Sequence, residues 1–278
     1  MEKETEIDYP KLLYQTTIQV FKDMNPKNEI KQKKFIEFLE RKKPKKIRKE
    51  LQRLLTIFEN NFPESTLKQV DNLLLFELSK TTIINSLELP RLEFNKKISL
   101  YKGDITDLKI DAIVNAANEY LLGCFVPNHP CIDNRIHMKA GPRLRQKCKE
   151  IMENQDHLEP EGKAKITEGF CLPVKFVIHT VGPKSNNDPH LLASCYRSSL
   201  DIAFKNSVKS IAFCCISCGM FGYDPSFATK IALKTVSDWI SQNPDAFDLI
   251  VFNVYTQENY QIYQNLLPKF FGEKTKEK

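Results

Sequence analysis

Glycine and cysteine are confined to one part of this 278-residue chain. All nine glycines lie at Gly103 or later, and all eight cysteines lie between Cys124 and Cys218. The residues before Gly103 are instead rich in Lys, Glu, Leu, Phe and Asn. This shift in composition predicts two regions of different architecture, in a chain long enough for one large domain or two modest ones.

The region before Gly103 has the apolar spacing of helices. One helical stretch begins at Tyr9, and three more cover Lys31–Leu39, Lys45–Phe58 and Ser65–Leu78. Their apolar residues recur on one side with a period of about 3.6. Asn-Pro, Lys-Pro and Phe-Pro dipeptides separate the stretches. The sequence therefore predicts an all-helical N-terminal region over residues 1–90.

The remainder of the chain alternates strand-like and helix-like segments. Runs of strand-like character lie at Ile98–Lys102, Ala112–Val114, Lys175–Val181, Ser210–Ile216 and Leu249–Val254. Helical patterns lie between them, at Ile136–Met152, His190–Asn206 and Ser226–Gln242. This alternation predicts an α/β domain over residues 91–271, with a mixed sheet and helices on both faces. A polar C-terminal tail is expected at 272–278. In sheets of this kind, ligands bind beyond the carboxyl ends of the strands.

One loop carries three side chains that bind metals. Cys124, His129 and Cys131 lie within eight residues, and Asp133 and Asn134 follow directly. The spacing Cys-x4-His-x-Cys is too tight for one face of a helix and too polar for a buried strand. Two thiols and an imidazole suit a zinc ion with an open fourth position, the pattern of a catalytic site. The loop therefore favours a metal-assisted enzyme.

Composition argues against several other classes of protein. No apolar run is long enough to span a membrane, and the N-terminus is acidic and polar, unlike a secretory signal. We therefore expect a cytoplasmic protein, with the nucleus as a second compartment. Its cysteines should bind metal or stay free and not form disulfides. The net charge of +6 does not by itself imply a nucleic-acid partner.

The stretch Arg41–Lys49 is strongly basic. It could serve as a nuclear import signal or as a contact patch for an anionic partner. A solvated turn at the start of a helix is the interpretation that we favour, because runs of charge usually lie on exposed faces.

Three short motifs lie where strands are expected to end. Gly103–Thr106 offers a carboxylate and backbone donors, although Gly-Asp is also a common turn. In Val114–Asn118 two alanines let a ligand come close, and the asparagines can bind sugar hydroxyls or serve as turn residues. The glycine-containing loop Ile216–Tyr223 precedes a helix and can present N–H groups to a phosphate. It is neither a Walker motif, nor GxGxxG, nor the elbow of a serine hydrolase.

Four motifs in a fixed order resemble the macrodomain family of ADP-ribose-binding modules. They are Gly-Asp-Ile-Thr, Asn-Ala-Ala-Asn, Ile-Asp-x-x-Ile-His-x-x-Ala-Gly and Ile-Ser-x-Gly-x-Phe-Gly-Tyr. The resemblance covers about Leu92 to Phe271 and implies a three-layer α/β/α fold. The cysteine- and histidine-bearing loop and the helical extension resemble the zinc-dependent macrodomain (Zn-Macro) subclass. Its members are protein-ADP-ribose hydrolases from bacteria and some microbial eukaryotes.

The resemblance also implies roles for individual residues. Asp104 would take the adenine amino group beside the Ile105 amide, Tyr255 would stack on adenine, and Asn118 would hold the distal ribose. One zinc ion per chain would be bound by Cys124, His129 and Cys131. The diphosphate and distal ribose would lie against Ile132, Asp133, Asn134, Ser217, Cys218, Gly219, Met220 and Phe221.

Asp133 and Asn118 are the catalytic candidates. Cleavage of the bond from the distal ribose to a protein side chain develops positive charge on the sugar and needs a nucleophilic water. Zinc can lower the pKa of a bound water to about 7 or polarise an oxygen. Asp133 follows a ligand by two residues, so it can act as a general base or orient the water. Metal-free hydrolytic macrodomains have a run of glycines in place of Cys124–Cys131, which favours a mechanism that uses metal.

Other histidines and cysteines have structural interpretations. His137 is an alternative metal ligand, although a buried structural histidine is favoured, and Cys148 follows helical spacing into the core. His179 ends a strand and is interpreted as a structural polar contact. Cys214 and Cys215 are interpreted as core thiols of a strand, and Cys218 as a small residue of the ligand loop that could also be reactive.

Three functions compete at this stage. The first is zinc-dependent removal of mono-ADP-ribose from a modified protein. The second is a non-catalytic reader that binds ADP-ribose or a modified partner and uses zinc only to shape the loop. The third, disfavoured, is a nucleic-acid role of the Arg41–Lys49 stretch, which salt-dependent binding to RNA or DNA would reveal. No membrane partner is expected.

Overall fold

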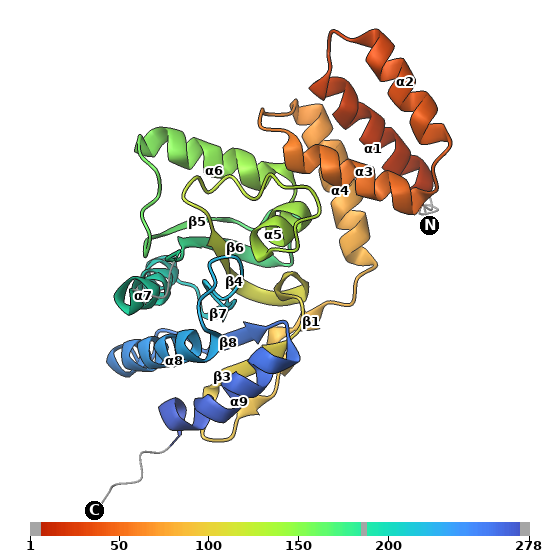
Figure 1. Cartoon of the computed structure of the whole chain (residues 1–278). Helices are drawn as coiled ribbons and strands as arrows, with labels where there is room; N and C mark the ends of the chain where they lie inside the picture. Colours follow the sequence, from red (N-terminus) through yellow and green to blue (C-terminus); the bar gives the residue numbers. More distant parts are fainter. Residues whose placement is uncertain (1–6, 185–187, 273–278) are drawn as a thin grey trace, which may run out of the picture.

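A computed structural model describes residues 7–184 and 188–272 of the chain (Figure 1). Of the polar tail expected at 272–278, only Gly272 is described, and the rest lies outside these ranges. The described helices are α1 Tyr9–Met24, α2 Glu29–Glu40, α3 Pro44–Ile57, α4 Glu64–Ser79, α5 Ile132–Ala140, α6 Pro142–Gln155, α7 Pro189–Lys205, α8 Pro225–Gln242 and α9 Gln257–Phe271. The strands are β1 Ile84–Asn85, β2 Arg91–Leu92, β3 Asn95–Lys102, β4 Leu108–Ala117, β5 Ala164–Glu168, β6 Val174–Val181, β7 Ser210–Phe213 and β8 Leu249–Val254, with short 3-10 turns at Ser86–Glu88 and Ile105–Asp107.

Three of the four N-terminal helices begin at residues that suit a helix start. The Asp8 side chain accepts a hydrogen bond from the Lys11 amide, and Asn28 does the same for Lys31, so each satisfies a free N–H of the first turn. Pro44 occupies the first position of α3, where its missing N–H costs nothing. These helices precede the first strand, as the sequence predicts.

The sheet is mixed, in the order β2-β3-β8-β7-β4-β6-β5. The five central strands run parallel, and the edge strands β2 and β5 run antiparallel to their neighbours. The short strand β1 pairs with the start of β4, so residues of the sheet begin at Ile84, before the boundary expected at 90. The carboxyl ends of β3, β8, β7 and β4 therefore meet at one edge, where the sequence motifs lie.

Helices cover both faces of this sheet (Figure 1). α5 and α6 contact β4 and β5 on one side, and α7, α8 and α9 contact one another in series on the other. The single helix predicted at Ile136–Met152 is wrong, because two helices meet there at Gly141. Gly141 has a φ of 88°, which favours glycine, and Pro142 cannot donate to the preceding turn.

Other differences lie at the ends of strands. The strand predicted at Ser210–Ile216 ends at Phe213, so Cys214 and Cys215 leave the sheet. Cys214 is buried, but Cys215 is only half-buried and does not sit in a strand core as predicted. The strand β5 was not anticipated from the sequence, because its apolar residues are few. Helix α9 was not anticipated either, although its buried residues Tyr263, Leu266, Leu267 and Phe271 recur at helical spacing.

The described residues form two hydrophobic cores that meet at α5. One fills the α/β domain, and the other lies among the four N-terminal helices but includes Met138 and Cys171 from the α/β domain. The two parts are also joined by the Arg143 guanidinium, which is paired with Asp71 at 2.6 Å and with Glu64 at 2.8 Å. The helical region therefore packs directly on α5, the helix that follows residues 123–131, which we name the metal-binding loop after the zinc site that the sequence predicts there.

Arg145 of α6 makes a second polar connection between the two parts. Its guanidinium donates to the carbonyls of Leu55, Thr56 and Phe58 at the end of α3, at 2.8 to 3.2 Å. It also donates to the carbonyl of Leu122, at 2.8 Å, just before the metal-binding loop. A cation at the carboxyl end of a helix interacts favourably with the helix dipole. Arg145 therefore links the end of α3 to the residue that precedes that loop.

We expect Arg145→Ala to lower the free energy of unfolding by about 3 kcal/mol, because buried carbonyls at two sites lose a shared donor. Urea denaturation followed by circular dichroism measures the change. Arg197→Ala, at an exposed arginine of α7, is the matched control and should change stability little. A loss in Arg145→Ala as small as in the control would refute this role.

None of the described helices is both long and apolar enough to cross a membrane.

Candidate functional site

Two cavities open at the carboxyl edge of the sheet. The first, of about 500 Å³, is lined by Asp104, Ile105, Asn253 and Tyr255 among others, and we name it the Asp104 cavity. The second, of about 510 Å³, is lined by the ends of β4 and β7 and by the 217–221 loop, and we name it the Asn118 cavity. They share one stretch of wall, residues 129–132. A long ligand can therefore extend from one cavity to the other along this wall.

The metal-binding loop runs between β4 and α5 and forms this shared wall. Gly123 allows the chain to turn here, because its φ is 81° and a Cβ would lie 2.9 Å from the His137 ring. At the other end of the loop, Cys131 is the N-cap of α5, and its Sγ accepts from the Asn134 amide at 3.4 Å. The loop is thus held at both ends by backbone geometry that the local sequence dictates.

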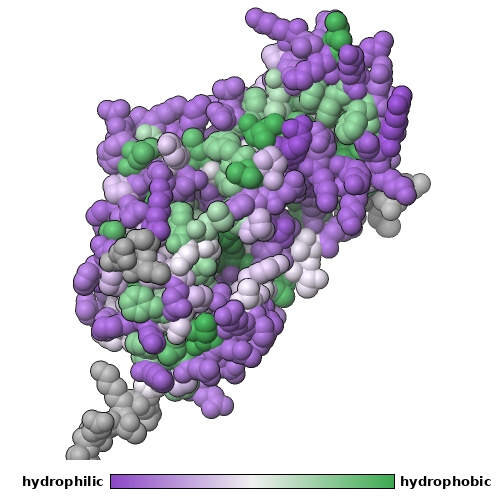
Figure 2. All heavy atoms as spheres, viewed as in Figure 1, coloured by the Kyte–Doolittle hydropathy of each residue, from purple (hydrophilic) through white to green (hydrophobic). Residues whose placement is uncertain are grey.

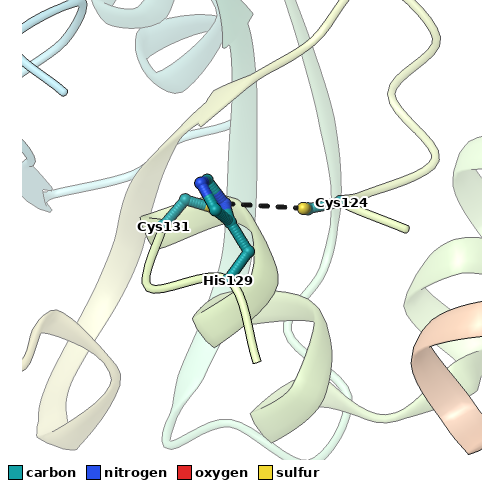
Figure 3. A group of neighbouring side chains, drawn as sticks. All are labelled: Cys124, His129 and Cys131. Carbon is teal, nitrogen blue, oxygen red and sulfur yellow. Dashed lines mark hydrogen bonds between the residues drawn. The ribbon is translucent and has the colours of Figure 1, made fainter. Parts of the chain in front are cut away.

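The loop brings Cys124, His129 and Cys131 together (Figure 3). One donor atom from each lies within 4.8 Å of the other two, and Cys124 Sγ is 3.6 Å from His129 Nδ1. All three side chains are half-buried, so a cation held here could still contact a ligand. Two sulfurs and one imidazole nitrogen are donors that zinc prefers.

The Cys131 thiol is neutral in the absence of a metal ion. Burial raises the pKa of its thiol to about 12, and the neighbouring Cys124 thiol contributes to the rise. A divalent cation at the triad would favour the thiolates and displace these protons.

Asp133 lies behind the triad in the wall of the Asn118 cavity. Its carboxylate accepts from Asn115 Nδ2 at 2.8 Å and from Asn118 Nδ2 at 3.5 Å, and His137 Nε2 is 3.5 Å away. Burial raises the pKa of Asp133 to about 6, although the Asn115 hydrogen bond and the Arg145 charge oppose the rise. A carboxylate with a pKa near neutrality is suited to accept a proton.

Asn118 connects Asp133 with the start of the loop. Its Nδ2 donates to the Gly123 carbonyl at 3.0 Å, and its Oδ1 accepts from the Tyr120 amide at 3.0 Å. The side chain remains partly exposed to the Asn118 cavity. The two residues expected to be catalytic are therefore in contact with each other.

The loop 217–221 faces them across the cavity and contains all five residues expected there, Ser217, Cys218, Gly219, Met220 and Phe221. Ser217 has a φ of 63°, and its buried hydroxyl has no hydrogen-bond partner within the described ranges. A side chain at Gly219 would meet no atom within 4 Å, so this backbone is open to a ligand. Met220 is 77% exposed at the rim.

Asp104 and Tyr255 flank the Asp104 cavity. The Asp104 carboxylate already accepts from the Thr106 amide at 2.9 Å and from Arg135 Nε at 2.6 Å. Burial opposes its ionisation, but the Thr106 hydrogen bonds and the Arg135 charge hold its pKa below the ordinary value. Tyr255 is 80% exposed, so its ring is free to move onto a ligand.

Ile132 and Asn134, at the start of α5, have different surroundings. Ile132 lines both cavities. Asn134 is buried, and its Nδ2 donates to the carbonyls of Val126 and His129 at 3.3 and 3.1 Å. Its side chain therefore holds the metal-binding loop, although the residue also lines the Asp104 cavity.

Comparisons with known proteins agree with this arrangement. Residues 114–232 match the family model "Macro domain". The "Protein-ADP-ribose hydrolase" of Staphylococcus aureus (strain MSSA476) is 43% identical over 201 residues, 70% of this chain and 75% of that protein. The chain belongs to the macrodomain family. A protein of the same name from Treponema medium is 50% identical over 173 residues, 60% of this chain and 66% of that protein's length.

A solved macrodomain has the same fold. The Trypanosoma brucei macrodomain in complex with ADP-ribose has a TM-score of 0.63 and 31% identity, over 77% of this chain and 94% of that one.

Several residues that line the cavities of this macrodomain were not predicted. They are Arg48 and Gln52 from α3, together with Arg135, Asn253, Cys215 and Asn259. Asn253 could have been found, because it lies near the carboxyl end of the last strand. Nothing in the local pattern of α3 indicates that Arg48 and Gln52 face a site in the other domain.

A buried polar cluster supports Asp133 from behind. His137, Cys148 and His179 are all buried, with donor atoms within 4.8 Å of one another. His179 is 3.2 Å from Asn115 Nδ2 and 3.1 Å from Thr167 Oγ1. These contacts agree with the structural interpretation of His179 and with the core position of Cys148.

The buried His179 should make stability depend on pH. Burial lowers its pKa to about 4, so the folded protein takes up this proton only below that pH, whereas the unfolded chain takes it up below about 6.5. The contribution of neutral His179 to the free energy of unfolding is complete above pH 6.5. It falls by roughly 3 kcal/mol as pH falls toward 4. Urea denaturation at several pH values checks this: His179→Asn should lack this loss, so its stability relative to the parent protein should rise as pH falls from 6.5 toward 4.

His157→Asn is the matched control, because this histidine is exposed. It should leave the pH profile unchanged. If His179→Asn kept the slope of the parent protein, His179 would not be its source.

Proposed function

We propose that this macrodomain is a zinc-dependent hydrolase that removes mono-ADP-ribose from modified proteins. The observation that carries the proposal is the contact of Asp133 with Asn118 beside the Cys124, His129 and Cys131 donors, in one cavity. The names of the Treponema and Staphylococcus relatives support a hydrolase, and the T. brucei complex supports ADP-ribose as the ligand.

The ligand would extend across both cavities. Adenine would occupy the Asp104 cavity, with its amino group on the Asp104 carboxylate, the Ile105 amide beside it and the Tyr255 ring above it. Because Arg135 also binds this carboxylate, adenine must share it or displace Arg135. The diphosphate would follow the open backbone of the 217–221 loop, where N–H groups suit an anion.

The distal ribose would lie in the Asn118 cavity. Asn118 would donate to or accept from its hydroxyls and so orient the C1 carbon toward the metal-binding loop. Cys124, His129 and Cys131 would hold one zinc ion per chain. When bound, the ion would supply a Lewis acid with a position open for an oxygen.

Asp133 would act as the base. Hydrolysis breaks the bond between C1 of the ribose and the protein side chain, and an oxygen from water forms the new bond to C1. Asp133 would accept a proton from that water, and a proton would pass to the leaving side chain. The carboxylate would also favour the positive charge that develops on the sugar. The products would be ADP-ribose and the unmodified protein.

The test is release of free ADP-ribose from a mono-ADP-ribosylated protein in the presence of zinc. We expect multiple turnovers, detected by chromatography. Binding of ADP-ribose without any release, under zinc-replete conditions, would refute hydrolysis and leave a reader of ADP-ribosylation.

A further inference from the structure

Helix α3 carries a basic groove next to the metal-binding loop. The groove has a volume of about 300 Å³ and is lined by Phe38, Lys42, Lys46, Lys49, Glu50, Arg53 and Asn128. Lys46, Lys49 and Arg53 are spaced by three and four residues, so they share one face of the helix. Figure 2 shows hydrophilic side chains along the outer rim of the helical region, with hydrophobic ones between them. We name this cavity the α3 groove.

The α3 groove holds uncompensated positive charge. Arg53 is paired with Glu50 at 2.6 Å, so these two charges cancel. Lys42, Lys46 and Lys49 are exposed, and none forms an ion pair with a carboxylate in the described part of the chain. Like charges that line one groove repel each other, and an anionic occupant relieves that repulsion.

The groove adjoins the Asp104 cavity. Asn128, near the tip of the metal-binding loop, lines both. Helix α3 also contributes to both, with Lys46 and Lys49 in the groove and Arg48 and Gln52 in the cavity. The groove shares no lining residue with the Asn118 cavity, so a protein segment attached to the distal ribose reaches the lysines only by crossing the metal-binding loop at Asn128.

We propose that the α3 groove binds an acidic segment of the ADP-ribosylated protein. This inference rests on the proposed function, which places the bond to that protein beside the metal-binding loop. Charge complementarity selects an acidic segment. Nucleic acid fits the groove less well. Phe38 is the one aromatic residue that lines the groove, and Lys42 Nζ lies 4.4 Å from the centre of its ring. The lysine therefore covers the surface on which a base could stack.

The experiment compares two ADP-ribosylated peptides that differ only in the flanking residues, glutamates in one and glutamines in the other. Each is hydrolysed by the parent protein, by Lys42→Glu/Lys46→Glu/Lys49→Glu, and by the control Lys205→Glu/Lys230→Glu/Lys269→Glu. The control changes the net charge equally at exposed lysines of α7, α8 and α9. We expect the groove variant to raise KM for the acidic peptide about tenfold, with kcat unchanged.

The glutamine peptide and the control variant should show changes of less than about threefold. An equal rise in KM for both variants, or for both peptides, would overturn the proposal. Binding of the unmodified glutamate peptide, measured by fluorescence anisotropy, tests the groove even if no peptide is hydrolysed. A failure of the groove to bind the acidic peptide is therefore distinguishable from a failure of the protein to hydrolyse the modified one. Tighter binding of a single-stranded RNA than of this peptide, lost in the groove variant, would overturn it in favour of nucleic acid.

Discussion

Asp133→Asn is expected to lower kcat for release of ADP-ribose by about 100-fold or more, with little change in ADP-ribose affinity. A general base contributes on the order of 100- to 10,000-fold to a rate. The substitution keeps the size of the side chain, and its amide oxygen can still accept from Asn115, which now donates to Asp133 at 2.8 Å. The adenine contacts proposed for Asp104 and Tyr255 would lie in the other cavity. Steady-state kinetics and calorimetric titration with ADP-ribose measure the two quantities.

Asp111→Asn is the matched control. Asp111 lies near the opposite end of β4, where its Oδ2 accepts from the amide and hydroxyl of Ser210. This variant should turn over at the parent rate. If Asp133→Asn also kept the parent kcat, a base other than Asp133 would carry the reaction, and its contact with Asn118 would be structural.

Cys124→Ala is expected to reduce the metal content of the purified protein from about one zinc per chain to near zero, and hydrolysis with it. Removal of one of three ligands leaves two donors, too few for a site that already keeps one position open. Metal content is measured by mass spectrometry of the purified chain, and turnover on the same sample.

Cys171→Ala provides the control for this loss. Cys171 is buried near Asp71, between the two cores, and takes no part in the triad. Its variant should retain the zinc of the parent protein. Retention of a full zinc equivalent in Cys124→Ala would mean that the metal is bound elsewhere.

Most of the α/β domain was predictable from local pattern. Strands such as Lys175–Val181 and Leu249–Val254 are nearly continuous runs of β-branched and aromatic residues, as expected when both faces of a strand are buried. They match β6 and β8 closely. Helix α9 was missed although its buried residues recur at helical spacing, and Pro268, a residue that usually argues against a helix interior, lies inside it.

The site was predictable only in part. Residues that lie close together in the sequence could be identified, whereas residues brought together by the packing of distant segments could not. Cys124, His129, Cys131 and Asp133 lie on one loop and the helix that follows, and the structure keeps them together. The ion pair of Asp104 with Arg135 and the entry of Arg48 into a cavity depend on the packing of distant segments. No local spacing encodes such contacts. Arg145, which joins α3 to the loop, is another example.

Because of this packing, the helical region forms part of the Asp104 cavity and is linked to the metal-binding loop. Its helix α3 lines a wall of the Asp104 cavity, and its end is fastened by Arg145 to the carbonyl that precedes the metal-binding loop. The α/β domain and the helical region should therefore be expressed together in any assay.

The most direct test of the account is turnover and binding measured on one sample as metal is removed and restored. The protein is treated with a chelator, dialysed, and assayed for release of ADP-ribose from a modified protein and for ADP-ribose binding, before and after one equivalent of zinc is added. We expect turnover to fall by about 100-fold or more on removal and to return with zinc, while binding changes far less. Full turnover by metal-free protein would contradict the account.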